Sequence, residues 1–394
     1  MLSVDQAINA LIKQSSVLVD VESISVAESS GRVLAEDVIA SIDVPPADNS
    51  AMDGYTFCYK DASENQFILA VSQRIPAGSS PTRLESGTAA RIFTGAEIPE
   101  GANCVAMQEN CSEIDGSVVL DSKAVIDGNI RPRGQDIASG AIILTKGSHI
   151  RAAEMGLLAS QGINKVSVYQ RLKVAVFSTG DELIEPGLKL QSGQIYNSNQ
   201  TMLMGLIKYL GMECIDMGTV ADNASATEDV LLRASNKADV VISAGGVSVG
   251  EEDYVKTVVE QLGTLDFWRV AIKPGKPLAF GSINQTPFIG LPGNPASVFV
   301  TFSVLATPFL LSSQGVASPR TRVTQSRALF NRNGESRDVF LRGRLVDSEE
   351  GCGVDIYPNQ SSGVLSSVAW GNVLVRQKSG ENIRVNDTVD VLIY

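Results

Sequence analysis

Alternating strand-like and helical segments between residues 173 and 311 constrain the fold of this 394-residue chain more than any other feature. Three apolar runs have the length of buried strands, and they lie at 174–177, 214–217 and 240–243. Two segments with apolar residues at helical spacing separate them, at 198–210 and 225–232. Strands that alternate with helices are typical of a parallel α/β sheet with right-handed connections. We therefore predict a parallel α/β domain over 171–318.

Helix-capping residues mark the ends of the predicted helices. Gly211 follows the first helix of this domain and is its predicted C-terminal stop. Ser225 and Glu228 have the spacing of a capping box, which predicts that the second helix is capped by Ser225. Ser3 and Gln6 have the same spacing at the start of the chain and predict a helix there.

The loops that follow the predicted strands carry a recurring set of acids, and ligands of α/β sheets bind at that edge. Three loops are acidic, and their acids are Asp181, Glu182, Asp222, Glu251, Glu252 and Asp253. Converging carboxylates repel one another unless a divalent cation neutralises them, and Mg²⁺ prefers one or two carboxylates plus phosphate oxygens. The plainer alternative also stands, because an acid near a helix N-terminus is stabilising without any ligand.

Two lysines in a neighbouring loop add positive charge to the same edge. Lys273 and Lys276 flank Gly275, and no charged residue occurs from Pro277 to Pro319. Acids, lysines and glycine loops together indicate an anionic ligand that is bridged by a metal ion. Each lysine is also consistent with an ordinary solvated side chain.

Gly246-Val247-Ser248-Val249-Gly250 matches the nucleophile elbow of serine hydrolases, but the histidine content argues against that reaction. The single histidine, His149, precedes Ser248 and is predicted to lie in an exposed turn. A phosphate-binding P-loop is also incomplete, because Glu251 follows Gly250 where that motif has lysine. The segment 245–250 is therefore interpreted as a close-approach loop whose backbone N–H groups bind a ligand.

The flanking regions have the character of β domains. Short β-like runs broken by turn signals fill 44–150, and β-like runs return after residue 318. The uncharged, apolar segment 296–311 is short for a membrane span and follows a Pro/Gly loop, which favours a buried helix.

Composition excludes several classes of partner and compartment. A net charge of −12 and a pI near 4.7 argue against a nucleic-acid or anionic-membrane partner. The five cysteines are odd in number and form no C-x-x-C pair, which favours a reducing compartment without a disulfide framework or zinc site. The N-terminus has no signal-peptide pattern, so we expect a cytoplasmic protein.

Eight motifs in order carry a resemblance to a known family. They are DVPPADNSAMDGYTF (43–57), RIFTGAEIPEGANCVAMQEN (91–110), RPRGQDI (131–137), STGDELIEPG (178–187), GQIYNSNQ (193–200), SAGGVSVGEEDYVK (243–256), AIKPGKPLAFG (271–281) and LPGNPAS (291–297). With these motifs the chain resembles the MoeA family of molybdopterin molybdenumtransferases, which includes the gephyrin E domain. The sequence differs from the common pattern at Asn103-Cys104 and at Gln135.

The resemblance implies an enzyme of molybdenum cofactor biosynthesis. The implied reaction inserts molybdate into adenylylated molybdopterin, uses Mg²⁺ and releases AMP. The implied protein is a cytoplasmic homodimer with a shared active site, in which the β-rich insertion reaches the partner's α/β domain. Other cofactor-biosynthesis proteins are further candidate partners.

The resemblance also implies a four-domain organisation. An elongated N-terminal domain combines 1–43 with 141–170, and a β-rich insertion domain spans 44–140. A molybdopterin-binding α/β domain spans 171–318, and a small C-terminal β-barrel-like domain spans 319–394.

The family's functional residues map onto matching positions of this sequence. The implied catalytic residues are Asp53, Thr94, Asp136, Glu182, Asp222 and Asp253, of which Glu182, Asp222 and Asp253 are the candidate Mg²⁺ ligands. The implied substrate-binding residues are Gly245, Gly246, Ser248, Gly250, Lys273, Lys276, Pro292, Pro295, Ser297, Arg342 and Ser362. Plainer interpretations exist for several of them: Asp53-Gly54 is a common turn pair, and Arg342 is compatible with a surface strand.

Two other functions are weighed against this one. A non-catalytic scaffold of the gephyrin type is disfavoured because such members carry an extra linker and an adenylyltransferase domain. A molybdopterin adenylyltransferase is disfavoured because it is a stand-alone α/β domain, whereas this chain has a β-rich insertion and a C-terminal β region. The choice between molybdenum and tungsten stays open.

Overall fold

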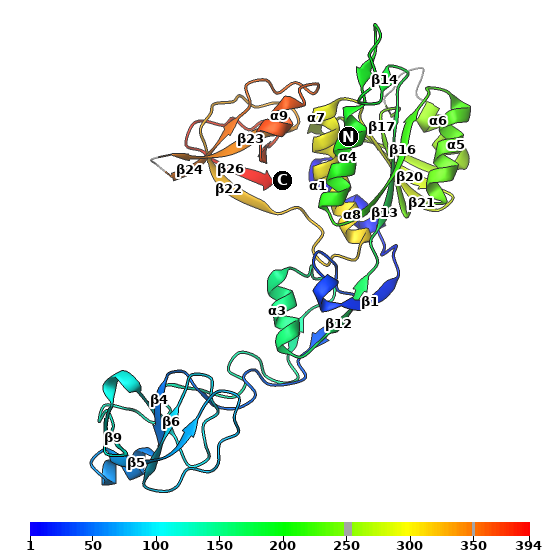
Figure 1. The fold of residues 1–394 in the computed structure, drawn as a ribbon. Coiled ribbons are helices and arrows are strands. Elements are labelled where there is room, and N and C mark those ends of the chain that lie inside the picture. Colours follow the sequence, from blue (N-terminus) through cyan, green and yellow to red (C-terminus); the bar gives the residue numbers. More distant parts are fainter. Residues whose placement is uncertain (248–253, 349–350) are drawn as a thin grey trace.

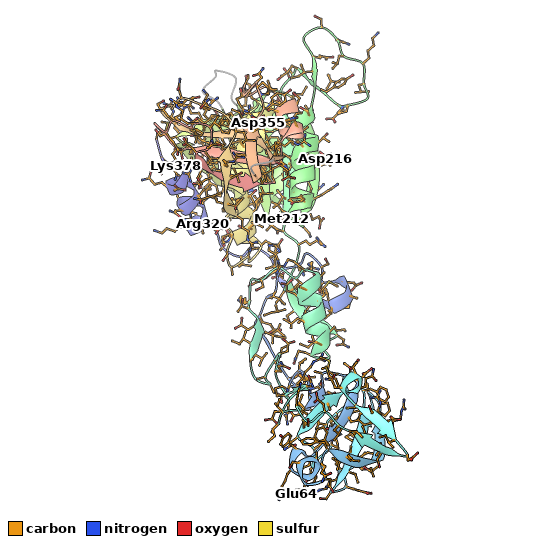
Figure 2. The ribbon with its side chains drawn as sticks, turned by 90° about the vertical axis from the view of Figure 1, so that its left-hand side faces the viewer. Glu64, Met212, Asp216, Arg320, Asp355 and Lys378 are labelled. Atoms are coloured by element: carbon orange, nitrogen blue, oxygen red, sulfur yellow. The ribbon has the colours of Figure 1, made fainter. Side chains whose placement is uncertain are left out.

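The computed structural model describes residues 1–247, 254–348 and 351–394. Figure 1 shows an elongated molecule with a β-rich distal domain at one end and a narrow middle domain. At the other end, the α/β domain lies beside a C-terminal β domain. Figure 2 shows the same separation from the side, with Glu64 in the distal domain and Asp355 at the opposite end of the molecule.

The α/β domain is built on a six-stranded sheet with the order β16-β13-β17-β21-β20-β18. Its strands are β13 (Lys173–Thr179), β16 (Glu213–Val220), β17 (Val240–Ala244), β18 (Gly263–Arg269), β20 (Pro277–Ile283) and β21 (Thr286–Leu291). The neighbours β16, β13, β17 and β21 run parallel, as predicted. The strands β20 and β18 pair antiparallel at one edge, which the sequence analysis did not predict.

Helices cover both faces of this sheet, as Figure 1 shows. They are α4 (Ser198–Tyr209), α5 (Ala224–Ser235) and α6 (Tyr254–Leu262). Leu203 of α4 packs with Val174 and Val240 on one face, and Val230 of α5 packs with Phe177 on the other. Because consecutive strand residues point to opposite faces and both faces are covered, β13 and β17 carry uninterrupted apolar runs at 174–177 and 240–242.

The predicted capping of α5 by Ser225 is wrong. Asn223 is the N-cap residue, and its side-chain oxygen accepts a hydrogen bond from the Ala226 N–H at 2.9 Å. Both residue types are good N-caps, but Asn223 has the extended backbone that this position requires, whereas Ser225 already lies within the helix. The predicted stop at Gly211 is confirmed by its φ of +78° directly after α4.

A long apolar helix completes the core beside the sheet. It consists of α7 (Pro295–Thr301), a π-helical turn (Phe302–Ala306) and α8 (Thr307–Ser313). The 19-residue helix is long and apolar enough to cross a membrane, yet 83% of its most apolar window is buried inside the molecule. The prediction of a buried helix is therefore confirmed. The N-terminal helix α1 (Val4–Gln14) has the predicted capping box and packs against this core through Leu11.

The C-terminal strands close into a barrel. They are β22 (Val323–Ala328), β23 (Asp338–Ser348), β24 (Gly351–Ile356), β25 (Val373–Gln377) and β26 (Thr388–Ile393). The pairing runs β23-β24-β22-β26-β25 and returns from β25 to β23, so the ring is closed. The short strand β19 (Ile272–Lys273) pairs with β23 and ties a loop of the α/β domain to the barrel. A short helix, α9 (Ser366–Trp370), lies between β24 and β25.

The distal domain is a second six-stranded sheet with the order β7-β4-β6-β5-β9-β8. Its strands are β4 (Gly54–Phe57), β5 (Ile68–Ile75), β6 (Thr88–Ile92), β7 (Cys104–Met107), β8 (Ser112–Ile114) and β9 (Ser117–Val119). A short helix, α2 (Tyr59–Glu64), and a strand pair, β3 (Asn49–Ser50) with β10 (Ile130–Arg131), complete it. Its core contains Phe57, Leu69 and Val118.

The middle domain is formed by chain segments from both sides of the distal domain. Its elements are β1 (Val21–Ser25), β2 (Val38–Ile39), β11 (Ile142–Leu144), α3 (Ala152–Ser160) and β12 (Lys165–Tyr169). The strand β1 pairs with β12, and β2 pairs with β11. His149 forms a bridge with Val33 here and is half-buried, so the prediction of an exposed turn is wrong. Burial lowers the pKa of His149.

Candidate functional site

A cleft of about 930 Å³ lies at the carboxyl ends of β13, β17 and β21 and extends to the C-terminal barrel. Strand-end loops of the α/β domain form most of its wall, and the barrel adds Arg337 and the segment 360–362. The short ribbon of β14 (Leu183–Ile184) and β15 (Ile195–Tyr196) adds further wall residues. The site therefore forms at the edge of the sheet where the strand order predicts a ligand.

The cleft brings together ten of the residues that the resemblance implies. They are Glu182, Asp222, Gly245, Gly246, Lys273, Lys276, Pro292, Pro295, Ser297 and Ser362. Three others, Ser248, Gly250 and Asp253, lie outside the described residues. Four further residues are placed elsewhere in the chain: Arg342 is buried in the barrel, Asp53 and Thr94 belong to the distal domain, and Asp136 lies where the distal domain joins the middle domain.

Two carboxylates contribute negative charge to the cleft. A Cβ atom on Gly180 would lie 2.6 Å from Glu182 Oε2, so this carboxylate sits over the end of β13. The backbone N–H of Asp222 donates to Asp181 Oδ1 at 3.0 Å, which joins the loops after β13 and β16. Among the residues that the structure describes, no group of three or more histidines, cysteines or acids could hold a metal ion by itself. Two carboxylates in an open cleft fit Mg²⁺, which completes its shell with water and substrate phosphates.

The two cleft lysines differ in how they are held. Lys273 Nζ lies 2.6 Å from Glu335 Oε2, and this hydrogen bond lowers the pKa of Glu335. Lys276 is exposed and forms no ion pair with any residue of the described ranges. Their loop is fixed by Gly275, because a Cβ there would lie 2.3 Å from Thr301 Oγ1 of α7. Within the described ranges, the loop thus presents one cation held by an ion pair, Lys273, and one without such a partner, Lys276.

The glycines after β17 are required by packing within the protein. Gly245 and Gly246 have φ values of +97° and +69°. A Cβ on Gly246 would lie 2.4 Å from Cγ2 of Val255, which is buried in α6. The N–H of Gly245 donates to the Leu291 carbonyl at 3.0 Å. The neighbouring strand uses that donor to fix the loop.

Arg342 is fully buried at the barrel side of the cleft, and the interpretation as a surface strand residue is therefore wrong. Its Nε donates to Ser367 Oγ at 3.0 Å, and its Nη2 donates to the Ser361 carbonyl at 3.1 Å. Its Nη1 is buried without a partner among the described residues. Burial lowers the pKa of Arg342 to about 10. Because Ser361 lines the cleft, this guanidinium supports the cleft wall from behind.

Other cleft residues were missed by sequence reasoning. Asn199 is 8% exposed, its Nδ2 donates to the Gly293 carbonyl at 2.7 Å, and its Oδ1 has no partner among the described residues. Arg337 reaches the cleft from the barrel and donates to the Ile272 carbonyl at 3.1 Å. Only the motif at 193–200 signalled Asn199, and no pattern signalled Arg337, since its place depends on how the barrel packs.

The distal domain holds a second polar cluster. Asp53 Oδ1 accepts hydrogen bonds from Thr94 N at 2.7 Å and from Thr94 Oγ1 at 2.8 Å. The Thr94 backbone hydrogen bond is the main cause that lowers the pKa of Asp53. Asp136 is exposed where the chain returns towards the middle domain. Figure 1 shows the distal domain at the opposite end from the α/β domain, so one chain does not join these residues to its own cleft.

Three family models match successive parts of the chain. They are described as the MoeA N-terminal region (domain I and II) at residues 2–162, a probable molybdopterin binding domain at 175–312, and the MoeA C-terminal region (domain IV) at 327–394. Together they span most of the sequence.

Similar proteins agree with these matches over nearly full length. A molybdopterin molybdenumtransferase of Haemophilus influenzae is 42% identical and covers 99% of this chain and 98% of that protein. A molybdopterin molybdenumtransferase of a Nostoc species is 36% identical, and the alignment covers 95% of this chain and 88% of that protein. The crystal structure of the molybdopterin biosynthesis MoeA protein of Pyrococcus horikoshii aligns over 100% of both chains, with a TM-score of 0.86 and 28% identity.

Proposed function

The chain belongs to the MoeA family, and on that basis we propose that it inserts molybdate into adenylylated molybdopterin and releases AMP. It is accordingly a molybdopterin molybdenumtransferase of molybdenum cofactor biosynthesis. One observation carries the proposal: a single cleft is lined by the acids Glu182 and Asp222 and by the lysines Lys273 and Lys276. Acids that can hold a metal ion and lysines that can bind oxyanions suit two substrates that are both anions.

The lysines would bind and orient the oxyanion, and Arg342 would add positive potential from behind the cleft wall. Molybdate is a dianion and must approach a phosphorylated pterin, so electrostatic repulsion is the obstacle to the reaction. Lys276 is free to contact an oxyanion, while Lys273 is held in place by Glu335. The buried Nη1 of Arg342, which has no partner in the part of the chain that the structure describes, adds positive potential behind Ser361. Fixed charges of this kind stabilise an anionic transition state without reorganisation.

The carboxylates Glu182 and Asp222 would hold Mg²⁺, which supplies Lewis-acid activation of the substrate phosphates when bound. The chain itself contributes orientation. The loop after β17 is fixed by the Gly245–Leu291 hydrogen bond, and α7 begins at the lining residue Pro295. Because positioning alone can lower a barrier by several kcal/mol, about 7 kcal/mol or more in favourable cases, no activated serine or cysteine is needed.

We further propose that the active unit is a homodimer in which each cleft is completed by the other copy's distal domain. Asp53 and Thr94 form a polar cluster in the distal domain, Asp136 lies where that domain joins the middle domain, and the distal domain is at the opposite end of the molecule from the α/β domain. A second copy related by two-fold symmetry can bring them to the cleft. This arrangement makes each site depend on two chains.

Mixing two inactive variants tests the function and the shared site together. Asp53→Ala removes the distal contribution, and Glu182→Ala removes the cleft contribution, so each variant alone is expected to lose molybdenum insertion. Co-refolding them in equal amounts yields heterodimers that have one intact site, and about a quarter of wild-type activity returns if chains pair at random. AMP release from adenylylated molybdopterin and formation of active cofactor are the two readouts.

The matched control is a mixture of Glu182→Ala with Asp222→Ala, which both damage the cleft and cannot restore it. No recovery in the first mixture, with both variants folded and dimeric, contradicts the shared site. Wild-type insertion rates in Glu182→Ala contradict the role given to the cleft acids.

A further inference from the structure

Two arginines and two aromatic rings form a ladder across the distal sheet. Tyr55 lies opposite Arg91 in the β4–β6 pair, and Arg74 lies opposite Arg91 in the β5–β6 pair. Phe93 follows Arg91 by two residues, which places both on the same side of the chain. The Arg91 guanidinium carbon is 5.1 Å from the Tyr55 ring centre and 4.8 Å from that of Phe93. The corresponding carbon of Arg74 is 4.5 Å from the Phe93 ring centre.

The two arginines are engaged to different degrees. Arg91 donates to the Gly54 carbonyl at 3.0 Å and to the side-chain oxygen of Gln108. Arg74 is exposed, and within the described ranges its guanidinium forms no ion pair or hydrogen bond. Stacking on Phe93 therefore restrains Arg74 while leaving its N–H groups available.

The charge of this ladder is unusual for such an acidic chain. Like charges directly opposite each other on neighbouring strands are destabilising, and the net charge of the chain is −12. Arg74 nevertheless lies opposite Arg91, and no acid among residues 1–247, 254–348 and 351–394 forms an ion pair with Arg74. An anion that binds to Arg74 and Arg91 would explain why these two cations are aligned without an acid between them. Phosphate suits this role, because guanidinium groups bind phosphate oxygens in a planar, bidentate way.

The ladder adjoins the polar cluster of the distal domain. Phe93 directly precedes Thr94, whose N–H and hydroxyl bind Asp53. Arg91 is close enough to Asp53 to favour its charged form and contribute to its lowered pKa. An anion held at Arg74 and Arg91 would therefore lie beside the residues that the proposed dimer delivers to the partner's cleft.

We propose that Arg74, Phe93 and Arg91 form a phosphate subsite that binds the nucleotide phosphate of the adenylylated substrate and of the AMP product. This inference rests on the proposed function for the identity of the ligand. Arg74 supplies the contacts to phosphate oxygens, Phe93 orients the Arg74 guanidinium, and Arg91 adds a second positive charge. The terminal phosphate of the pterin shares the same chemistry and is the other source that the test must separate.

Calorimetric titration of the full-length protein with AMP tests the subsite. Arg74→Ala is expected to weaken AMP binding about tenfold or more, because contacts from a charged group to phosphate are lost. Arg74→Lys keeps the positive charge but lacks the planar guanidinium group. Its AMP affinity is therefore expected to lie between that of the wild type and that of Arg74→Ala. Arg83→Ala is the matched control: Arg83 is an exposed arginine of the same domain, and its ion pair is with Glu100 at 3.6 Å.

Two further ligands separate the possible sources of the phosphate. Ribose 5-phosphate carries the phosphate without the base, and adenosine carries the base without the phosphate. The subsite predicts that Arg74→Ala weakens ribose 5-phosphate binding and leaves adenosine binding unchanged. If Arg74→Ala impairs binding of a pterin monophosphate but not of AMP, the assignment to the nucleotide is overturned.

The remaining outcomes also decide the proposal. AMP affinity that is unchanged in Arg74→Ala, equally reduced in Arg83→Ala, or undetectable in the wild type overturns the subsite. Molybdenum insertion measured on the same preparations keeps the two proposals apart. If the wild type inserts molybdenum and Arg74→Ala has the same KM for the adenylylated substrate as the wild type, only the subsite proposal fails. If AMP binds through Arg74 but the wild type inserts no molybdenum, only the proposed function fails.

Discussion

Replacing Gly246 by alanine tests why the loop after β17 is rich in glycine. Sequence patterns favour a close approach of the backbone to a ligand, whereas the structure favours packing against α6. The added Cβ would lie 2.4 Å from Val255 Cγ2 and 3.0 Å from Thr179 Oγ1. Val255 is 1% exposed and has little room to withdraw. The backbone must also hold alanine at a φ of +69°.

The expected cost follows from two separate effects. Left-handed backbone costs a non-glycine residue roughly 1–2 kcal/mol. Overpacking a buried site costs about 1–3 kcal/mol. Gly246→Ala is thus expected to lower the free energy of opening around β17 and α6 by about 2–5 kcal/mol, in the absence of any ligand. Gly187→Ala is the control for the backbone effect alone, because Gly187 has a φ of +100° and no atom within 4 Å of the added Cβ.

Hydrogen–deuterium exchange of β17 and α6 is the appropriate assay, because it reports local opening in a chain with several domains. A second substitution, Val255→Ala, should remove most of the packing cost from Gly246→Ala and leave the backbone cost. The reasoning is refuted if Gly246→Ala exchanges no faster than Gly187→Ala when each is compared with the wild type. It is also refuted if exchange is unchanged and only substrate binding is lost, since the glycine would then serve the ligand.

Two further predictions concern the ion pairs that hold the domains. Arg376 is 17% exposed and bridges Asp338, which is 15% exposed, and Asp5, which is 56% exposed. In urea unfolding, Asp338→Ala should therefore lower the free energy of unfolding by about 3 kcal/mol, and Asp5→Ala should lower it by less than about 1 kcal/mol. Equal losses of stability in the two variants would contradict the role of burial. Hydrogen bonding from Arg151 lowers the pKa of Glu154 from 4.5 to about 2, so its stabilising effect on α3 is full above pH 4.5 and is lost as the pH falls towards 2. An NMR titration of Glu154 should give a midpoint near 2 that returns towards 4.5 in Arg151→Ala, and an unshifted midpoint in the wild type would contradict this pair.

The parallel half of the α/β sheet could be predicted because its strands are buried on both faces. Val174 and Phe177 of β13 pack into different clusters on the two sides of the sheet, so the run is uninterrupted and easily recognised. The antiparallel strands β18 and β20 are harder to recognise, because β18 begins at Gly263, β20 begins at Pro277 and Gly281 lies within β20. The start of α5 was misplaced for a related reason: several good capping residues stand close together, and backbone geometry chooses between them.

The candidate site was predictable where it depends on strand ends and not where it depends on domain packing. Glu182 and Asp222 follow directly from the position of loops in an α/β sheet. Arg342 was named only through a family resemblance, and its burial has no local signal. Phe340 packs into the core of the α/β domain while Leu341 packs into the barrel core, so β23 is covered on both faces. Only the assembled fold reveals that Arg342 lies between two cores.

The neck of the molecule bears on the proposed dimer, because a shared site requires the distal domain to keep a defined direction. The chain crosses the neck twice, and side chains tie the two crossings together. Asp43 accepts from Ser139 N at 2.8 Å and from Arg133 Nε at 2.6 Å, which joins the outgoing segment to the returning one. Gln161 of the middle domain accepts from the N–H groups of Ser41 and Ile42 at 3.0 and 3.3 Å.

These hydrogen bonds make the neck a braced connection between the two domains. Each bond alone is worth only about 1 kcal/mol, yet together they fix both crossings to each other and to the middle domain. A braced arm loses less conformational freedom when it docks than a flexible one, so the second copy can bind it at a lower entropic cost. Asp43→Ala should therefore weaken dimer formation and molybdenum insertion in parallel, while AMP binding at Arg74 on the distal domain should be retained.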